Sequence, residues 1–316
     1  MNSQQLGSNQ NKLMVGCWQL DDRSWKKISE PDIAHAIDTY ISLGVNAFDT
    51  ADIYGRSEEI LGNLLKKRDC QVFTKAVFFS GIPSAMQVRS KIETSLHRLQ
   101  RDTLDSVQVH WHDSNLDFAS TFDTLNELVE QGKIQQIGVT NFNTAMLEKA
   151  LKFAPIHTHQ VQYSLIDRRV EASMQALCLK HNIQLLTYGP LAGGFLSDKF
   201  LGMKQPHLQS DHARSFYYSN TIQSHGGWPS TFSMLGTLAE VAQKYDKSIS
   251  QVALNWVSQQ PGVGAVISGL TLSRQQIQSN VEAFGWNLEI EDIELLSRRS
   301  AELFIQPGDI YSYERN

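Results

Sequence analysis

Four residues of types that exchange protons stand at the ends of predicted strands or on the loop beside them. Asp49, Lys75 and His110 each close an apolar run of the kind that forms a buried strand. Tyr54 lies on the loop that follows the first of these runs, immediately before Gly55. A carboxylate, an ammonium, an imidazole and a phenol that converge on one place form a titratable cluster, which is typical of proton-transfer chemistry.

The residues around this cluster match a known family. The stretch 48–58 reads Phe-Asp-Thr-Ala-Asp-Ile-Tyr-Gly-Arg-Ser-Glu, and Thr74-Lys75 and His110-Trp111 follow it. With these motifs the chain resembles the aldo-keto reductase superfamily, and the resemblance extends over residues 13–280. It implies an NAD(P)-dependent oxidoreductase that interconverts carbonyl compounds and alcohols.

Carbonyl reduction gives each of the four residues a role. The reaction needs a hydride donor and a proton donor that neutralises the developing alkoxide. A free phenol has a pKa near ~10 and is a weak acid at neutral pH, but a neighbouring ammonium stabilises the phenolate and lowers that pKa. We therefore expect Tyr54 to be the acid, Lys75 to lower its pKa, and Asp49 to hold Lys75. His110 would orient the carbonyl, and the resemblance assigns the same roles to these positions.

Two other functions stay open. The segments 110–112 and 157–159 each read His-x-His, and alternate strand residues point the same way, which would suit a TIM-barrel metal hydrolase. Lys75 and Asp49 fit an ion pair better than a metal shell, so we assign no metal site. The same barrel could also be a nucleotide-sensing regulatory subunit, although the complete set of four residues argues against that function.

The resemblance also implies where a cofactor binds. Thr140 and Asn141 stand at the family's Ser-Asn pair, which holds the nicotinamide carboxamide together with a glutamine matched by Gln160. Tyr188 matches the aromatic residue on which the nicotinamide ring stacks. Arg274 is a guanidinium near the expected phosphate end, so NADP(H) is the preferred cofactor and NAD(H) remains possible. The expected cofactor-binding residues are Thr140, Asn141, Gln160, Tyr188, Leu191, Ser268, Gly269, Arg274 and Asn280.

Short apolar segments alternate with helical periodicity along the whole chain. The predicted strands are 13–18, 45–49, 71–75, 106–110, 134–139, 156–162, 183–188 and 263–267. This alternation predicts one (β/α)8 TIM barrel as a single domain over residues 1–316. A doubly wound sheet is the alternative, but no Gly-x-Gly-x-x-Gly follows a predicted strand. Active sites of the barrel fold lie at the carboxyl ends of the strands, where the polar residues above are expected.

The segment 191–230, after the seventh strand, shows no clear period and is predicted to be a lid-like loop. It holds the aromatic run 216–218. Helical patterns follow at 232–245 and 250–259, and the last predicted helix is 273–284. Three tryptophans are candidates for the apolar wall of a substrate site: Trp18, Trp111 and Trp228.

Composition narrows the partners. The formal charge of −5 suggests no nucleic-acid surface, and no apolar run approaches the ~20 residues of a membrane span. Residues 1–11 are polar, so we expect a flexible N-terminus without a signal peptide and a cytoplasmic protein. Cys17, Cys70 and Cys178 form no CxxC pair and are expected to be free thiols. The expected partner is a small carbonyl or alcohol substrate, and the oligomeric state is left open.

Overall fold

The computed structural model describes residues 12–21, 23, 25–79, 82–112, 116–204, 206, 213–303 and 306–308. The expected flexible segment 1–11 and the last residues of the chain lie outside this set.

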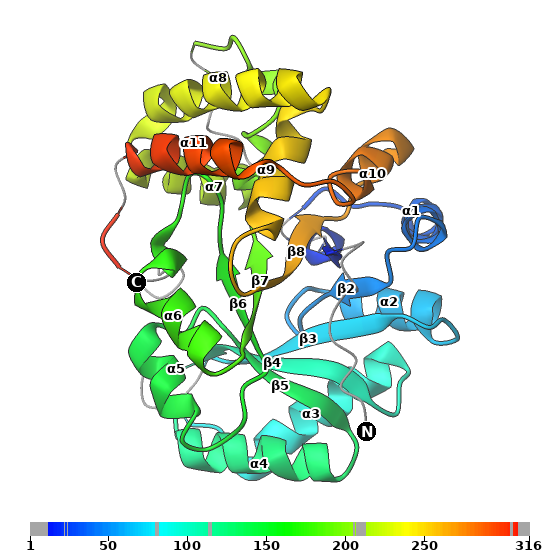
Figure 1. Ribbon diagram of the computed structural model, residues 1–316. Helices are drawn as coiled ribbons and strands as arrows, with labels where there is room; N and C mark the ends of the chain where they lie inside the picture. The colour runs from blue at the N-terminus through cyan, green and yellow to red at the C-terminus, as the bar shows by residue number, and fades with distance from the viewer. Residues whose placement is uncertain are drawn as a thin grey trace.

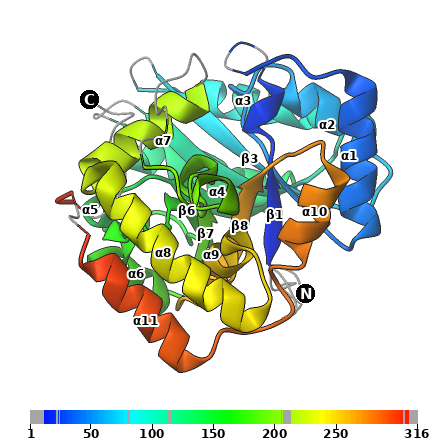
Figure 2. The same ribbon diagram turned by 90° about the horizontal axis from the view of Figure 1, so that it is seen from above.

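Parallel strands close into one barrel, in which each strand pairs with the next along the chain and β8 pairs with β1. The strands are β1 (Leu13–Gly16), β2 (Ala47–Asp49), β3 (Gln71–Phe78), β4 (Leu104–His112), β5 (Ile134–Thr140), β6 (Thr158–Gln162), β7 (Gln184–Tyr188) and β8 (Val263–Gly269). Figure 1 shows the sheet from the side, and Figure 2 shows helices placed around it. The prediction of a (β/α)8 barrel built on these strands is confirmed.

Helices alternate with the strands, and several of them begin at a Ser, Asp or Asn side chain that caps the first turn. They are α1 (Glu30–Ser42), α2 (Ser57–Leu65), α3 (Ala85–Leu99), α4 (Phe118–Glu130), α5 (Thr144–Ala150), α6 (Ser173–Lys180), α7 (Ala213–Ser224), α8 (Gly227–Tyr245), α9 (Ile249–Ser258), α10 (Arg274–Val281) and α11 (Ile290–Ala301). Ser84 and Ser248 open α3 and α9 with complete capping boxes, which satisfy backbone N–H groups that a helix start leaves free. None of the described helices is long and apolar enough to cross a membrane.

The barrel interior has an apolar floor with polar residues above it. A buried cluster fills the floor: Met14, Ala47, Phe73, Leu186, Ala265 and Ile267. Strand residues two apart share a face, so Asp49 follows Ala47 on the inward side of β2, and Lys75 follows Phe73 on β3. Tyr188 rests against the same apolar cluster. The alternation of side chains along the strands therefore places Asp49 and Lys75 together above the buried apolar cluster.

Four strands extend further than predicted at their carboxyl ends, and two of them are β5, which ends at Thr140, and β8, which ends at Gly269. β3 continues past Lys75 to Phe78, and β4 continues past His110 to His112. The residues Ala76, Val77 and Phe78 are buried, so the sheet has apolar contacts beyond the lysine. A charged residue inside a strand looked like a strand end in the sequence because Lys is rarely buried without a partner.

The prediction of a lid-like loop over 191–230 is wrong in part. The described part of this segment contains two 3-10 turns, η3 (Ala192–Gly194) and η4 (Asp198–Phe200), the helix α7 and the start of α8. Helix α7 has a weakly amphipathic sequence, which is why periodicity missed it. Its Tyr217 and Ile222 are buried against the rest of the molecule, so tertiary contacts support this helix.

Helix α11 was not predicted, although its ends carry helix signals. Glu291 and Asp292 lie in its first turn, and Arg298 and Arg299 lie in its last turn, which complements the helix dipole. It lies beside α8 in both views of the ribbon (Figure 1, Figure 2).

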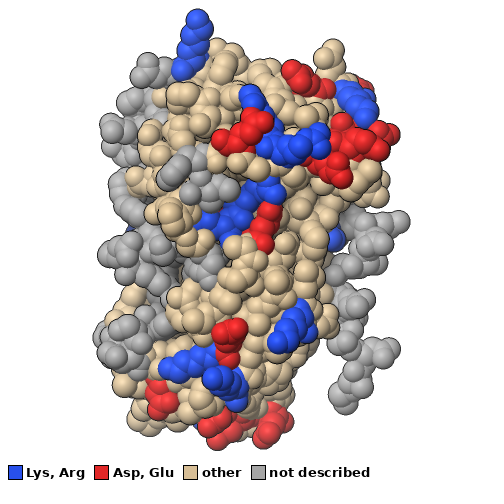
Figure 3. Space-filling view, turned by 60° about the vertical axis from the view of Figure 1, so that its left-hand side comes forward, with Lys and Arg blue, Asp and Glu red and all other residues tan. Residues whose placement is uncertain are grey.

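Basic and acidic side chains lie next to one another on the face drawn in Figure 3, in mixed groups of both signs.

Candidate active site

The centre of the site is a buried ion pair between β2 and β3. The Lys75 ammonium donates to both carboxylate oxygens of Asp49 and to the backbone oxygen of Thr50, at 2.8 Å in each case. The side chain of Lys75 is 0% exposed and that of Asp49 is 5% exposed. Burying an unpaired charge has a large unfavourable free energy, so the buried Lys75 and Asp49 side chains stabilise each other.

Gln160 connects this ion pair to the opposite side of the barrel. Its Nε2 donates to Asp49 Oδ1 at 2.8 Å, although the two residues lie on β6 and β2. On the neighbouring strand, Thr140 Oγ1 donates to Gln108 Oε1 at 3.1 Å. Gln160, which is expected at a cofactor, is thus bonded directly to Asp49, which is expected at the chemistry.

Tyr54 stands on the loop after β2, next to the ammonium. Lys75 Nζ lies 5.0 Å from the centroid of the Tyr54 ring. The loop is fixed from both sides, because Asp52 N donates to the backbone oxygen of Lys75 at 3.1 Å and the hydroxyls of Thr50 and Ser57 lie 2.8 Å apart. The structure therefore brings together the phenol and the ammonium that the sequence placed on separate segments.

These residues open into one large cleft at the carboxyl ends of the strands, with a volume of about 1390 Å³. Of the residues singled out in the sequence, the following line it: Trp18, Asp49, Tyr54, His110, Thr140, Asn141, Gln160, Tyr188, Leu191, Ser268, Gly269 and Asn280. At one end Asn280 Nδ2 donates to Ser268 Oγ at 3.3 Å. The cleft thus runs from the Tyr54 phenol to Ser268 of β8 and Asn280 of α10.

Asn141, directly after β5, has unusual backbone geometry. Its φ is 54°, in the left-handed region where Asn is among the better-tolerated non-glycine residues. Its Oδ1 accepts a hydrogen bond of 3.1 Å from the hydroxyl of Tyr188. This bond turns the amide nitrogen of Asn141 away from Tyr188, where it can serve a ligand.

Some expected site residues lie elsewhere. Lys75 is buried behind the cleft wall, and Arg274 is exposed at the start of α10 and is not among the described residues that line the cleft. Trp228 is 6% exposed, and its ring packs on those of Phe195 and Phe200, which do line the cleft. Trp228 is therefore a packing residue behind the wall. The side chain of Trp111 lies outside the described residues.

The cleft also has lining residues that the sequence analysis did not assign. Trp25, Gln19 and Gln276 belong to it, and so do Tyr217 and Tyr218 of α7. The aromatic run at 216–218 was visible in the sequence, but nothing local indicated which way those rings would face. Helix α7 decides this by lying against the cleft, since it makes contacts with η3 beside β7.

Two buried acids support the loop that carries Tyr54. Burial raises the pKa of Asp52, and its ion pair with Lys91 opposes that shift. Burial also raises the pKa of Glu58, which accepts a 2.7 Å hydrogen bond from Thr74 and lies 3.4 Å from Arg98. Helix α3 thus supplies both basic partners from outside the barrel.

The described histidine side chains of the two His-x-His segments join no metal-ligand set. Among the described residues, no group of three or more His, Cys, Asp and Glu side chains is placed to hold a metal ion. His159 faces away from the cleft, and its Nε2 accepts a 3.2 Å hydrogen bond from the backbone nitrogen of Phe142. The three cysteines are buried free thiols, as predicted.

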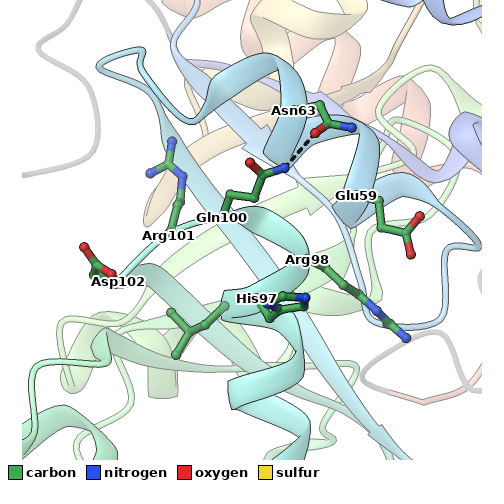
Figure 4. Close-up of a pocket in the computed structure, with 8 residues that line it drawn as sticks. Glu59, Asn63, His97, Arg98, Gln100, Arg101 and Asp102 are labelled. Atoms are coloured by element: carbon green, nitrogen blue, oxygen red, sulfur yellow. Dashed lines mark hydrogen bonds between the residues drawn. The ribbon is translucent and has the colours of Figure 1, made fainter.

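A second hollow lies between α2 and α3, on the outside of the barrel (Figure 4). Two of its polar side chains have hydrogen bonds that hold them in the fold: Gln100 Nε2 donates to Asn63 Oδ1 at 2.6 Å, and Arg101 Nη2 donates to the backbone oxygen of Cys70 at 2.7 Å. The segment through Arg101 leads into the amino end of β4. This hollow is therefore separate from the strand ends that carry the polar cluster.

Comparison with known proteins agrees with this geometry. The model of the aldo/keto reductase family matches residues 12–299. The aldo-keto reductase YhdN of Bacillus subtilis (strain 168) is 28% identical over 298 residues, which are 90% of this chain and 88% of YhdN. The NADH-specific methylglyoxal reductase of Escherichia coli (strain K12) is 27% identical over 320 residues, with 92% of this chain and 95% of that protein covered.

A solved structure is similar over nearly the whole chain. The glycerol dehydrogenase AKR11B4 from Gluconobacter oxydans gives a TM-score of 0.81 at 25% identity, covering 95% of this chain and 94% of that chain. With a family match that spans nearly all of its length, this chain belongs to the aldo/keto reductase family and is an NAD(P)-dependent oxidoreductase.

Proposed function

We propose that this oxidoreductase reversibly reduces an aldehyde or ketone to an alcohol, with Tyr54 as the proton donor. The observation that carries the proposal is the buried Lys75 ammonium, which lies 5.0 Å from the centre of the Tyr54 ring and is held by Asp49. A positive charge at this position stabilises the negative charge that a phenol acquires as it releases its proton. In a poorly solvated pocket this stabilisation is stronger than it would be in water.

The residues divide the work as follows. The Tyr54 hydroxyl gives its proton to the carbonyl oxygen while the alkoxide develops, and in the reverse direction the phenolate takes the proton back. His110 lines the same cleft and orients the carbonyl oxygen by a hydrogen bond. Asp49 holds the Lys75 side chain in place, so the electrostatic environment exists before the substrate arrives.

The cleft has the groups that a nicotinamide nucleotide needs. Such a nucleotide would supply the hydride for reduction or accept it in the reverse direction. The ring of Tyr188 and the amides of Asn141 and Gln160 line the cleft. The amide nitrogen of Gln160 is used on Asp49, and its amide oxygen can accept a hydrogen bond from a carboxamide N–H. The buried Oε1 of Gln19 lines the same cleft and has no hydrogen-bond partner among the described residues. A bound polar ligand would satisfy that acceptor.

NADP(H) is the proposed nucleotide, with NAD(H) as the alternative. Arg274 stands in the first turn of α10, and a guanidinium at a helix N-terminus is a favourable partner for a phosphate. Ser279 and Asn280 on the same helix line the cleft. The relative named as an NADH-specific methylglyoxal reductase supports the alternative, and its name also supports a small carbonyl substrate. Fluorescence titration with both nucleotides decides the preference, and a tighter constant for NADH would reverse it.

The direct test replaces Tyr54 by Phe. We expect Tyr54→Phe to lower kcat/KM for aldehyde reduction by about 10²–10⁴-fold, the usual contribution of a general acid, while the Kd for the nucleotide stays within about twofold. Tyr245→Phe, which also removes a phenol hydroxyl but lies outside the cleft lining, is the matched control and should keep full activity. A fully active Tyr54→Phe enzyme would rule out the assignment. Tight nucleotide binding without turnover across aldehydes, ketones and sugars would instead favour a regulatory subunit.

A further inference from the structure

Helix α7 brings a second tyrosine hydroxyl to the one on Tyr188. The hydroxyls of Tyr217 and Tyr188 lie 3.1 Å apart, and Tyr188 donates to Asn141 Oδ1 at 3.1 Å. A phenol has one proton, and Tyr188 uses it on Asn141, so Tyr217 is the donor of the other bond. The result is a chain of hydrogen bonds from Tyr217 through Tyr188 to Asn141.

The ring of Tyr217 belongs to a row of aromatic rings in the cleft lining. It packs edge-to-face on Trp18, with ring centroids 6.2 Å apart and an interplanar angle of 68°. Trp18 in turn packs on Trp25 at 5.1 Å and 87°. All three rings line the cleft that Tyr54 and His110 also line. A carbonyl compound that reaches Tyr54 therefore passes an aromatic wall, of which Tyr217 is the member from α7.

The barrel rim is shaped to receive the next residue of α7. A Cβ at Gly193 would stand 2.5 Å from Tyr218 Cδ2, and a Cβ at Gly189 would stand 2.9 Å from Tyr218 Cε1. Both glycines also have a positive φ, +67° for Gly189 and +70° for Gly193. Glycine therefore suits these positions for two reasons: it adopts this backbone conformation, and it leaves room for the Tyr218 ring. The ring of Tyr218 thus seats α7 directly above the end of β7.

The far end of α7 packs beside a buried polar group. His225, just after the helix, lies with Nε2 3.4 Å from Asp167 Oδ1. Asp167 is fixed by Arg169, at 2.8 and 2.6 Å, and by Gln162 Nε2 at 2.9 Å. These residues are buried, and together with Tyr218 they fix the part of α7 that follows Tyr217.

We propose that Tyr217 is a positioning and specificity-determining residue of the active site. Through its hydroxyl it fixes Tyr188 and, by way of Tyr188, the Asn141 amide. Through its ring it limits the width of the carbonyl compound that reaches Tyr54. The inference rests on the proposed function, in which Tyr188 and Asn141 hold the nicotinamide.

Two variants separate the two roles. Tyr217→Phe keeps the ring and removes the hydroxyl, so we expect the NADPH Kd to rise roughly fivefold, the effect of about one net hydrogen bond, with unchanged preference between aldehydes. Tyr217→Ala removes both, so Kd rises similarly while the kcat/KM ratio of 2-naphthaldehyde to benzaldehyde rises about tenfold. Tyr245→Phe is the matched control and should change neither quantity. Intrinsic fluorescence titration and steady-state kinetics give both readouts.

The outcomes distinguish failure of the role of Tyr217 from failure of the proposed carbonyl-reducing function. A wild-type enzyme that binds neither NADPH nor NADH would overturn the proposed function, and this inference with it. A wild-type enzyme that binds and turns over, together with an unchanged Kd in Tyr217→Phe and an unchanged aldehyde ratio in Tyr217→Ala, would overturn the role of Tyr217 alone. A merely structural role would lower both aldehyde rates equally in Tyr217→Ala, which also contradicts the proposal. Tyr217→Phe decides the hydroxyl's role even if the alanine variant fails to fold.

Discussion

At the scale of single residues, the site depends on two charges that have left water together. Asp49 and Lys75 satisfy each other, and Thr50 and Gln160 complete their hydrogen bonds. The buried Asp49–Lys75 pair has no net charge, and it keeps an ammonium beside the Tyr54 ring. The catalytic role and the folding role of Lys75 therefore depend on the same contacts.

A double-mutant cycle on this pair has a distinctive expected result. Asp49→Asn leaves the Lys75 charge without its carboxylate, and Lys75→Met leaves the Asp49 charge without its ammonium, so each should lower the free energy of unfolding by about 3–5 kcal/mol. The double variant removes both charges and should cost less than the sum of the two. Urea-induced unfolding followed by circular dichroism measures all four proteins. Strict additivity would show that the two charges do not depend on each other.

At the scale of elements, α2 and α3 meet at a glycine just beyond the Tyr54 loop. A Cβ on Gly62 of α2 would stand 2.2 Å from the backbone oxygen of Arg98 on α3, closer than real atoms approach. The same two helices carry Glu58 and Arg98, which support the loop. Close approach of these helices therefore helps to hold Tyr54 over Lys75.

Glycine-to-alanine changes in two helices should have opposite signs. Gly62→Ala forces α2 and α3 apart and should lower the free energy of unfolding by about 1–3 kcal/mol, the usual cost of overpacking. Gly236 of α8 has no atom within 4 Å of an added Cβ, so Gly236→Ala should raise that free energy by ~0.5–1 kcal/mol through helix propensity. Thermal and urea unfolding measure both. A destabilised Gly236→Ala or a neutral Gly62→Ala would contradict the packing described here.

At the scale of the whole molecule, buried acids make stability depend on pH. Burial raises the pKa of Glu58 above its ordinary value of 4.5, so the folded protein holds this proton to higher pH than the unfolded chain does. The stability that this acid contributes is therefore fully present below about pH 4.5 and is lost as pH rises through the raised pKa. The loss amounts to roughly 1.4 kcal/mol per unit of pKa shift.

Glu58→Gln isolates this contribution. The amide cannot titrate and still accepts the hydrogen bond from Thr74, so the variant should show a shallower fall in unfolding free energy as the pH rises above about 4.5 than the parent protein. Glu302→Gln on the exposed surface is the matched control and should follow the parent. Urea unfolding at a series of pH values gives the curves. Parallel curves for parent and Glu58→Gln would remove Glu58 as a source of the dependence.

The sequence by itself determined the barrel and the chemical types at its rim. Eight apolar segments at barrel spacing predicted all the strands, because buried parallel strands need continuous apolar runs. Alternation along β2 and β3 then fixed that Asp49 and Lys75 face inward. The motif around Tyr54 carried the rest, since its residues are close in the chain and local rules apply to them.

Tertiary structure alone decided which groups meet across the barrel. The bond from Gln160 to Asp49 joins β6 to β2, and the bond from Tyr217 to Tyr188 joins α7 to β7. No local pattern predicts such contacts, because they depend on closure of the sheet and on how α7 seats against Gly189 and Gly193. The weak amphipathic pattern of α7 hid it from sequence analysis, and packing on the barrel rim made it a helix with Tyr217 in the cleft.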